Sequence, residues 1–172
     1  MLDEDQVLIL HKSGRVEEIV PIAEAGDDIR ELQGILSPGF INCHCHMELS
    51  HTKGMIPSGT GLIPFLSGVM KNRKGDPEQM QDAIENAEEE LWNNGTVAVG
   101  DICNTDISIS LKTKNRLRYV NFLELAGLPE AIAEERYASA IQLRHRFSSN
   151  ALQSSIVPHA PYSVSKKLFS RI

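Results

Sequence analysis

Short apolar runs separated by turn residues dominate the first part of the chain. One apolar run covers residues 6–10, a Ser-Gly turn follows at 13–14, and a second run covers residues 16–22. Residues 29–36 alternate imperfectly between apolar and polar and are expected to form a third strand. Strands of this length joined by turns predict a small antiparallel β segment over residues 1–36.

From residue 37 the hydrophobic period changes from strand to helix and back several times. Strands are predicted at 40–43, 96–99, 117–125 and 155–157, and helices at 63–70, 76–94, 106–112, 129–147 and from 165 onward. Among the helices, 76–94 has the strongest signals, because Asp76 can cap it and Pro77 suits its first turn. This α/β alternation predicts a parallel sheet with right-handed crossovers. Either an open doubly wound sheet or the first half of a βα barrel satisfies it.

Length and composition narrow these alternatives. The chain has 172 residues, 41% of them hydrophobic, and its 17 Lys+Arg against 23 Asp+Glu give a net charge of −6. This balance disfavours nucleic acid or an anionic membrane as the main partner. The odd count of three cysteines, with no signal peptide at the start, predicts a reducing, cytoplasmic location. A complete eight-stranded βα barrel usually takes about 250 residues, so only part of one fits.

Two histidines stand at the end of the first strand of the parallel region. His44 and His46 share a strand face about 6.6 Å apart, which allows both imidazoles to reach one metal ion. Glu48 has the same parity if the strand continues that far, whereas Cys43 and Cys45 would face the helices. Two alternatives remain open, namely histidines that merely close a strand and a structural zinc site with Cys43 and Cys45.

The sequence around these histidines resembles a known family. Residues 37–50, SPGFINCHCHMELS, resemble the Pro-Gly-Phe/Leu-Ile/Val-Asn-x-His-x-His motif that opens the barrel of the amidohydrolase superfamily. Residues 157–165, VPHAPYSVS, are similar to the Pro-His-x-Pro-Tyr-x-x-Ser segment of its deaminase and chlorohydrolase branch. Residues 95–101, GTVAVGD, resemble the branch's Gly-Thr-Thr segment. That branch includes deaminases of S-adenosylhomocysteine, aminodeoxyfutalosine and guanine, and the resemblance covers nearly the whole chain.

The resemblance implies a fold and a site. Residues 37–172 would form the first four βα units of a (β/α)8 TIM-type barrel, and residues 1–36 part of a composite β-sandwich domain. His44 and His46 would bind one divalent metal ion, zinc or iron. His159 would contact a small-molecule substrate, and Glu48 would lie near that substrate or behind the metal. The implied reaction is hydrolytic deamination, in which metal-activated water attacks a ring carbon of a purine-like or other N-heterocyclic compound and ammonia leaves.

The sequence departs from the family pattern in its missing later motifs. The family's His-x-x-Glu, its further His and its metal-binding Asp are absent, so the general acid–base residue is unknown and the chain is expected to be the front half of a longer enzyme. A homo-oligomer is compatible with the sequence. The alternatives are a non-catalytic α/β binding domain with structural histidines, and an inactive fragment that self-associates through apolar strand edges.

Two carboxylates at predicted strand ends need a separate interpretation. Asp101 ends the strand at 96–99, and a structural bond to a neighbouring loop is the expected role. Glu124 ends the strand at 117–125, where it is a weaker candidate for the site because strand ends carry function in parallel α/β folds. The glutamates at 88–90 are expected to form a solvated helix face.

Overall fold

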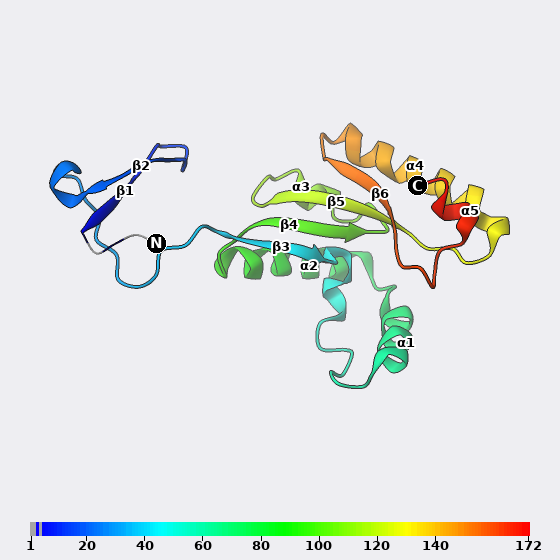
Figure 1. The fold of residues 1–172 in the computed structure, drawn as a ribbon. Coiled ribbons are helices and arrows are strands. Elements are labelled where there is room, and N and C mark those ends of the chain that lie inside the picture. The colour runs from blue at the N-terminus through cyan, green and yellow to red at the C-terminus, as the bar shows by residue number, and fades with distance from the viewer. Residues whose placement is uncertain (1–2, 4) are drawn as a thin grey trace. The chain divides into compact units, whose positions relative to one another are not determined.

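The computed structural model describes residue 3 and residues 5–172, and it divides into two compact units, Met1–Pro38 and Gly39–Ile172. In the first unit, strand β1 (Gln6–Leu10) pairs antiparallel with β2 (Val16–Pro21), and a short 3-10 helix, η1 (Ile22–Glu24), follows (Figure 1). This hairpin confirms the two strands predicted on either side of the Ser-Gly turn. Assignment of residues 1–36 to a composite β-sandwich stays a prediction.

The third strand expected at residues 29–36 does not form. The segment is irregular, and its apolar side chains lie in solvent, with Ile35 98% exposed. Alternation of apolar residues predicts a strand only if a neighbouring strand accepts the backbone hydrogen bonds and covers one face. The described part of the first unit supplies only the β1–β2 pair, and no strand in it pairs with residues 29–36.

The second unit is built on a four-stranded parallel sheet in the order β3-β4-β5-β6 (Figure 1). Its strands are β3 (Phe40–Cys45), β4 (Thr96–Cys103), β5 (Arg118–Leu125) and β6 (Ser154–Pro158). The connecting elements are η2 (Met47–Thr52), α1 (Leu62–Asn72), α2 (Pro77–Asn93), α3 (Ile109–Lys112), η3 (Glu130–Ile132) and α4 (Ala133–Ser149), and α5 (Lys166–Phe169) follows β6. Each strand pairs with the next one along the chain, as in a βα barrel. In a doubly wound sheet, by contrast, the chain returns to the middle of the sheet and adds its later strands on the other side. The fold is therefore α/β, an antiparallel hairpin followed by a parallel sheet consistent with part of a barrel.

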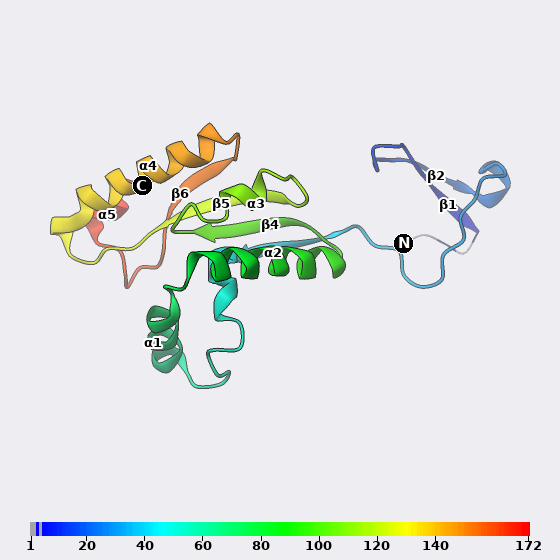
Figure 2. The same ribbon diagram turned by 180° about the vertical axis from the view of Figure 1, so that it is seen from behind.

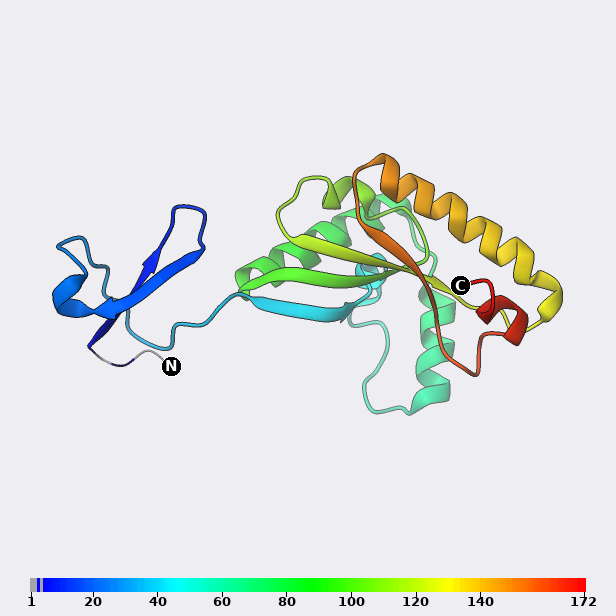
Figure 3. The same ribbon diagram turned by 45° about the horizontal axis from the view of Figure 1, so that its top comes forward.

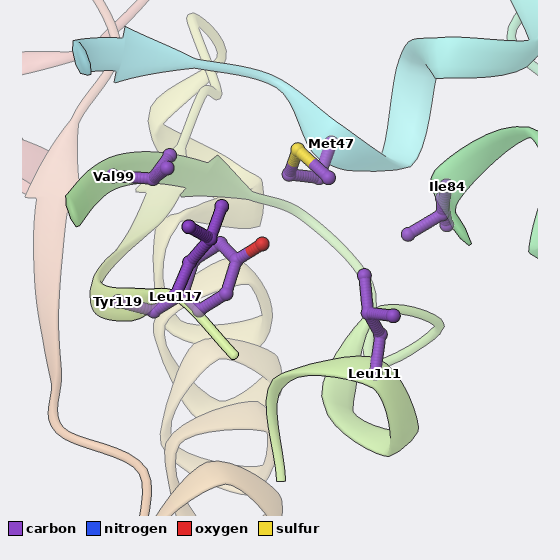
Figure 4. Close-up of a cluster of buried hydrophobic side chains, with 6 residues drawn as sticks. All are labelled: Met47, Ile84, Val99, Leu111, Leu117 and Tyr119. Atoms are coloured by element: carbon purple, nitrogen blue, oxygen red, sulfur yellow. The ribbon is translucent and has the colours of Figure 1, made fainter. Parts of the chain in front are cut away.

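Helices α2, α3 and α4, which follow β3, β4 and β5, pack against one face of this sheet, whereas α1 buries none of its residues. Alternate residues of β4 and β5, including Val99, Cys103 and Leu123, point to that face and are buried. The first core cluster joins the sheet to η2, α2 and α3 through the six side chains of Figure 4: Met47, Ile84, Val99, Leu111, Leu117 and Tyr119. Helix α2 runs along the sheet beside β3 and β4 (Figure 2), and α4 lies beside β6 and α5 (Figure 3). Helices on one face only are the arrangement of a barrel wall.

Helix α2 shows how local sequence sets an element boundary. Asp76 caps it by accepting a hydrogen bond from the Gln79 N–H at 3.0 Å, and Pro77 occupies its first turn, as predicted. Gly95 then adopts a φ of +79°, which lets the chain turn directly into β4. In the described part of the chain no helix has both the length and the apolar character required to cross a bilayer.

The sheet face opposite the helices remains exposed, and we predict that the isolated chain self-associates. Phe40 and Val120 point to this face and are 62% and 38% exposed. β3 and β6, the outer strands, also present unpaired backbone groups, which favour pairing between copies. Sedimentation velocity over a range of concentrations should show an increasing sedimentation coefficient. Val120→Lys should reduce this increase, and a monodisperse monomer at every concentration would contradict the prediction.

Candidate metal centre at the carboxyl ends of the strands

The two predicted metal ligands converge at the carboxyl end of β3. His44 lies within the strand and His46 follows it, and their Nε2 atoms are 3.3 Å apart. Two nitrogen ligands at about 2.0–2.1 Å from a tetrahedral zinc ion are separated by about 3.3–3.4 Å. The separation of the two Nε2 atoms is therefore compatible with ligation of one zinc ion by both imidazoles. Without metal, the same separation suits a weak N–H···N hydrogen bond between the rings.

The surroundings of His46 favour its metal-binding form. Burial lowers the pKa of this half-buried imidazole, and the charge of His44 lowers it further, whereas the Glu124 carboxylate opposes both effects. A neutral imidazole is the form that ligates a metal. Nδ1 of His46 is buried and has no hydrogen-bond partner among the described residues. None of these residues therefore orients the imidazole through its second nitrogen, as outer-shell partners do in metal sites.

The chain fits part of a metal site. Within the described ranges, no group of three or more His, Cys, Asp or Glu side chains is placed to hold a metal ion. Cys45 packs against the core cluster on the helix side, and burial raises the pKa of its thiol. A protonated thiol on the opposite face from His44 is a poor ligand, which disfavours the structural zinc alternative. Two histidines are therefore the ligands that this geometry offers.

Glu48 has a different environment from the one expected by strand parity. β3 ends at Cys45 and the chain enters η2, so the alternation of strand faces does not extend to Glu48. Its carboxylate is buried and accepts four hydrogen bonds, from the backbone N–H groups of Asn104 and Thr105, from the Thr105 hydroxyl, and from the Arg73 guanidinium at 3.0 Å. These bonds tie η2 to the loop after β4. A role of Glu48 in substrate binding stays a prediction.

His159 follows β6 at the same end of the sheet. Its backbone N–H donates to the Leu125 carbonyl at 2.9 Å, and its Nδ1 lies 2.6 Å from the Ser163 hydroxyl. The edge of the ring also contacts Tyr162, with centroids 5.8 Å apart. These contacts fix an exposed imidazole, and no described residue forms a hydrogen bond with its Nε2. Because β4 and β5 separate β6 from β3, His159 does not join the His44–His46 pair.

Two cavities lie near these strand ends. One, of about 390 Å³, is lined by His46 together with residues of η2 and α2, including Lys53 and Ala87. The other, of about 520 Å³, is lined by Arg73, Glu124 and residues of α4, and it contains none of the histidines. Glu124 is thus among the residues that line a cavity, and its carboxylate also opposes the lowering of the His46 pKa by burial. Its role in the site stays a prediction.

Sequence patterns did not point to the partners of Glu48 and Asp101. Arg73, Asn104 and Thr105 bind Glu48 across 25 to 57 positions of sequence. Lys112 is fully buried and forms an ion pair with Asp101. From the sequence alone, a lysine in a short helix is expected at the surface. The structural bond expected for Asp101 is the one that it accepts from the Met47 N–H. The solvated helix face expected at 88–90 is wrong at Glu88, which is 2% exposed and accepts a hydrogen bond from the Tyr119 hydroxyl at 2.8 Å.

Comparison with known proteins gives a consistent set of relatives. No protein-family model matches the chain. It is 30% identical over 135 residues to an adenosine deaminase of Helicobacter pylori, and 29% identical over 134 residues to an aminodeoxyfutalosine deaminase of a Nitratiruptor species. These alignments cover 78% and 76% of this chain and 33% of each relative. The chain thus spans about a third of the length of the curated relatives it matches.

Solved structures show the same likeness in three dimensions. The crystal structure of Helicobacter pylori aminofutalosine deaminase in complex with methylthio-coformycin superposes with a TM-score of 0.65 at 31% identity. A second crystal structure of that enzyme gives a TM-score of 0.60 at 27% identity. Each match covers 78% of this chain. It covers 33% of the first solved chain and 31% of the second. The matched part of this chain therefore has the fold of part of such a structure.

Proposed function

Because this chain is a distant homologue of the adenosine and aminodeoxyfutalosine deaminases, in the deaminase branch of the amidohydrolase superfamily, we propose that it contributes to the active site of a metal-dependent aminohydrolase. The observation that carries the proposal is the pair of Nε2 atoms of His44 and His46, which are 3.3 Å apart at a strand end. Metal ligation by His44 and His46, with zinc or iron bound, is the first part of the proposal.

The bound metal would supply the Lewis acidity that activates a water molecule for attack on a ring carbon carrying an amino group. The residues of this chain have three tasks around that reaction. His44 and His46 hold the ion, His159 presents its free Nε2 to the substrate, and Glu124 adds a negative charge at the same end of the sheet. The substrate class we propose is a purine-like or other N-heterocyclic amine, because the relatives are an adenosine deaminase and an aminodeoxyfutalosine deaminase.

In the complete site, residues other than these 172 would supply the remaining metal ligands and the acid–base carboxylate. The chain spans a third of the length of its relatives, and the described residues hold no cluster of three ligands. We therefore expect the chain alone to bind metal without releasing ammonia from purine nucleosides. The whole site would be needed for turnover.

Zinc binding by the 172-residue chain is the test, and we expect one ion per chain. Isothermal titration with Zn²⁺, together with metal analysis of the dialysed protein, measures the stoichiometry and the Kd. His145→Ala is the matched control, because this exposed histidine lies on α4 away from the strand ends and its loss should leave the stoichiometry at one. Absence of zinc binding by the unmodified chain, or loss of the single site in His145→Ala, would refute the proposal.

A further inference from the structure

A buried ion pair lies behind the candidate metal centre and has no part in the site described so far. Lys112 of α3 and Asp101 of β4 are both fully buried, with 2.5 Å between Lys112 Nζ and Asp101 Oδ2. The ammonium group also lies 2.6 Å from Asn121 Oδ1 and 3.3 Å from Cys103 Sγ. Its donors are therefore directed at three polar atoms on two neighbouring strands.

Aromatic side chains hold the ammonium group in place from two other directions. Lys112 Nζ is 5.2 Å from the ring centroid of Tyr119 and 5.3 Å from that of Phe147. Both distances are within the range of cation–π attraction, which is strongest where water is excluded. The position of the lysine charge is thus fixed by side chains from β4, β5 and α4.

The other oxygen of Asp101 connects this pair to the candidate ligands. Asp101 Oδ1 accepts a hydrogen bond from the backbone N–H of Met47 at 2.8 Å, across 54 positions of sequence. Met47 directly follows His46 and is itself 1% exposed within the core cluster (Figure 4). The buried carboxylate therefore holds the peptide unit next to His46 at the point where β3 turns into η2.

A stabilising effect on the fold does not by itself account for the ion pair. Replacing a buried ion pair with well-packed apolar residues is often neutral or favourable for stability, because desolvation offsets the attraction. The geometry gives the pair a directional effect instead. Lys112 orients the carboxylate, and the carboxylate orients the Met47 amide.

We infer that Asp101 and Lys112 are positioning residues that hold His46 with its Nε2 directed at the metal shared with His44. The inference rests on the proposed function. Without the lysine, the buried carboxylate has lost its counter-charge and is free to turn away from the Met47 amide. The turn after His46 then relaxes, the spacing of the two Nε2 atoms varies, and metal affinity falls.

Two charge-free double variants isolate the critical hydrogen bond. In Asp101→Asn/Lys112→Met the asparagine oxygen can still accept the Met47 N–H, whereas in Asp101→Leu/Lys112→Met nothing accepts it. Asparagine and leucine have the same branched arrangement of side-chain heavy atoms, although leucine is bulkier, and methionine matches the lysine stem. The two proteins therefore differ chiefly in that one acceptor. Lys112→Met alone tests whether the carboxylate needs its counter-charge. Lys114→Met is the matched control, because Lys114 pairs with Glu85 in solvent.

The readouts are the Kd for Zn²⁺ against a chelating dye and the exchange rate of the Met47 amide hydrogen, with circular dichroism to confirm that each variant is folded. Loss of an outer-shell partner typically weakens metal binding about 10–100-fold, and we expect that loss for Asp101→Leu/Lys112→Met and for Lys112→Met. Asp101→Asn/Lys112→Met and Lys114→Met should bind close to the unmodified chain. The Met47 amide should exchange faster in the leucine variant than in the asparagine variant.

The outcomes separate this inference from the proposed function. If the unmodified chain binds zinc and the leucine and asparagine double variants bind it equally tightly, the positioning role is wrong while the metal site stands. If the unmodified chain binds no zinc, the proposed function fails, and the positioning role fails with it. Equal amide exchange in the two double variants would also overturn the positioning role, because Asp101 would then not hold the Met47 peptide.

Discussion

Zinc binding by the chain is expected to weaken by more than about 100-fold when His46 is replaced by alanine, since loss of even an outer-shell partner costs about 10–100-fold. His44 and His46 place their Nε2 atoms 3.3 Å apart, and removal of either leaves a single imidazole. One exposed imidazole holds a metal ion no better than any surface histidine. His44→Ala should therefore have the same effect, and the double variant should add little. Titration with Zn²⁺ measures all three.

His159→Ala separates a metal ligand from a substrate contact at the same end of the sheet. His159 is fixed through Nδ1 by Ser163 and is separated from the pair by two strands, β4 and β5, so its loss should leave the Kd for zinc unchanged. Unfolding temperatures measured on each protein show whether an altered Kd reflects altered folding. Unchanged zinc affinity in His46→Ala would mean that the close approach of the two rings is only a hydrogen bond.

Most of the elements of the second unit were predictable because local signals coincide there. The cap at Asp76 and the turn at Gly95 delimit α2, and both ends of the helix lie within a residue or two of the prediction. The strand at 96–99 was predicted too short, since β4 continues to Cys103. The polar residue Asp101 ended the apolar pattern, but Lys112 neutralises it inside the fold, and a strand can continue through a paired charge.

The site was predictable only as far as strand alternation extends. Parity along residues 40–46 put His44 and His46 on one face, and the structure places their ring nitrogens together. The same parity failed at Glu48, because a 3-10 turn begins at Met47. The hydrogen bonds that hold Glu48 and Asp101 join residues 11 to 57 positions apart, and pairings of that range depend on packing that no local pattern encodes.

Replacing Glu48 with alanine is expected to lower the free energy of unfolding by about 3 kcal/mol, the low end of the range for removing one member of a buried ion pair, because the Arg73 side chain is 34% exposed. Glu48 is 4% exposed, and its loss leaves two backbone N–H groups, a hydroxyl and the Arg73 guanidinium without their acceptor. Donors that lose their acceptor in a partly buried position are costly, and these four connect η2 to the end of α1 and to the loop after β4. Urea unfolding followed by circular dichroism and by the fluorescence of Trp92 measures the change.

Two further variants show which property of Glu48 matters. Glu48→Gln keeps acceptor oxygen for the Asn104–Thr105 backbone and loses the charge, so about 1–3 kcal/mol should be lost, as for a charged hydrogen bond. Glu90→Ala is the surface control. Its carboxylate is 58% exposed and pairs with Lys53 in solvent, so the change should stay within about 1 kcal/mol. A loss in Glu48→Ala no larger than that in Glu90→Ala would contradict the structural role.

The same variants also test the substrate-binding role predicted for Glu48 from the family resemblance. If Glu48 mainly connects the segments after β3 and β4 through hydrogen bonds, the free energy of unfolding should fall in proportion to the number of bonds removed. Alanine should then be worse than glutamine. If the Glu48 carboxylate instead binds a ligand, the variants should keep nearly all of their stability and lose affinity for that ligand. All four observed donors belong to the protein and the carboxylate is buried, so we expect the loss of stability. Zinc affinity should fall only to the extent that the turn after His46 loosens.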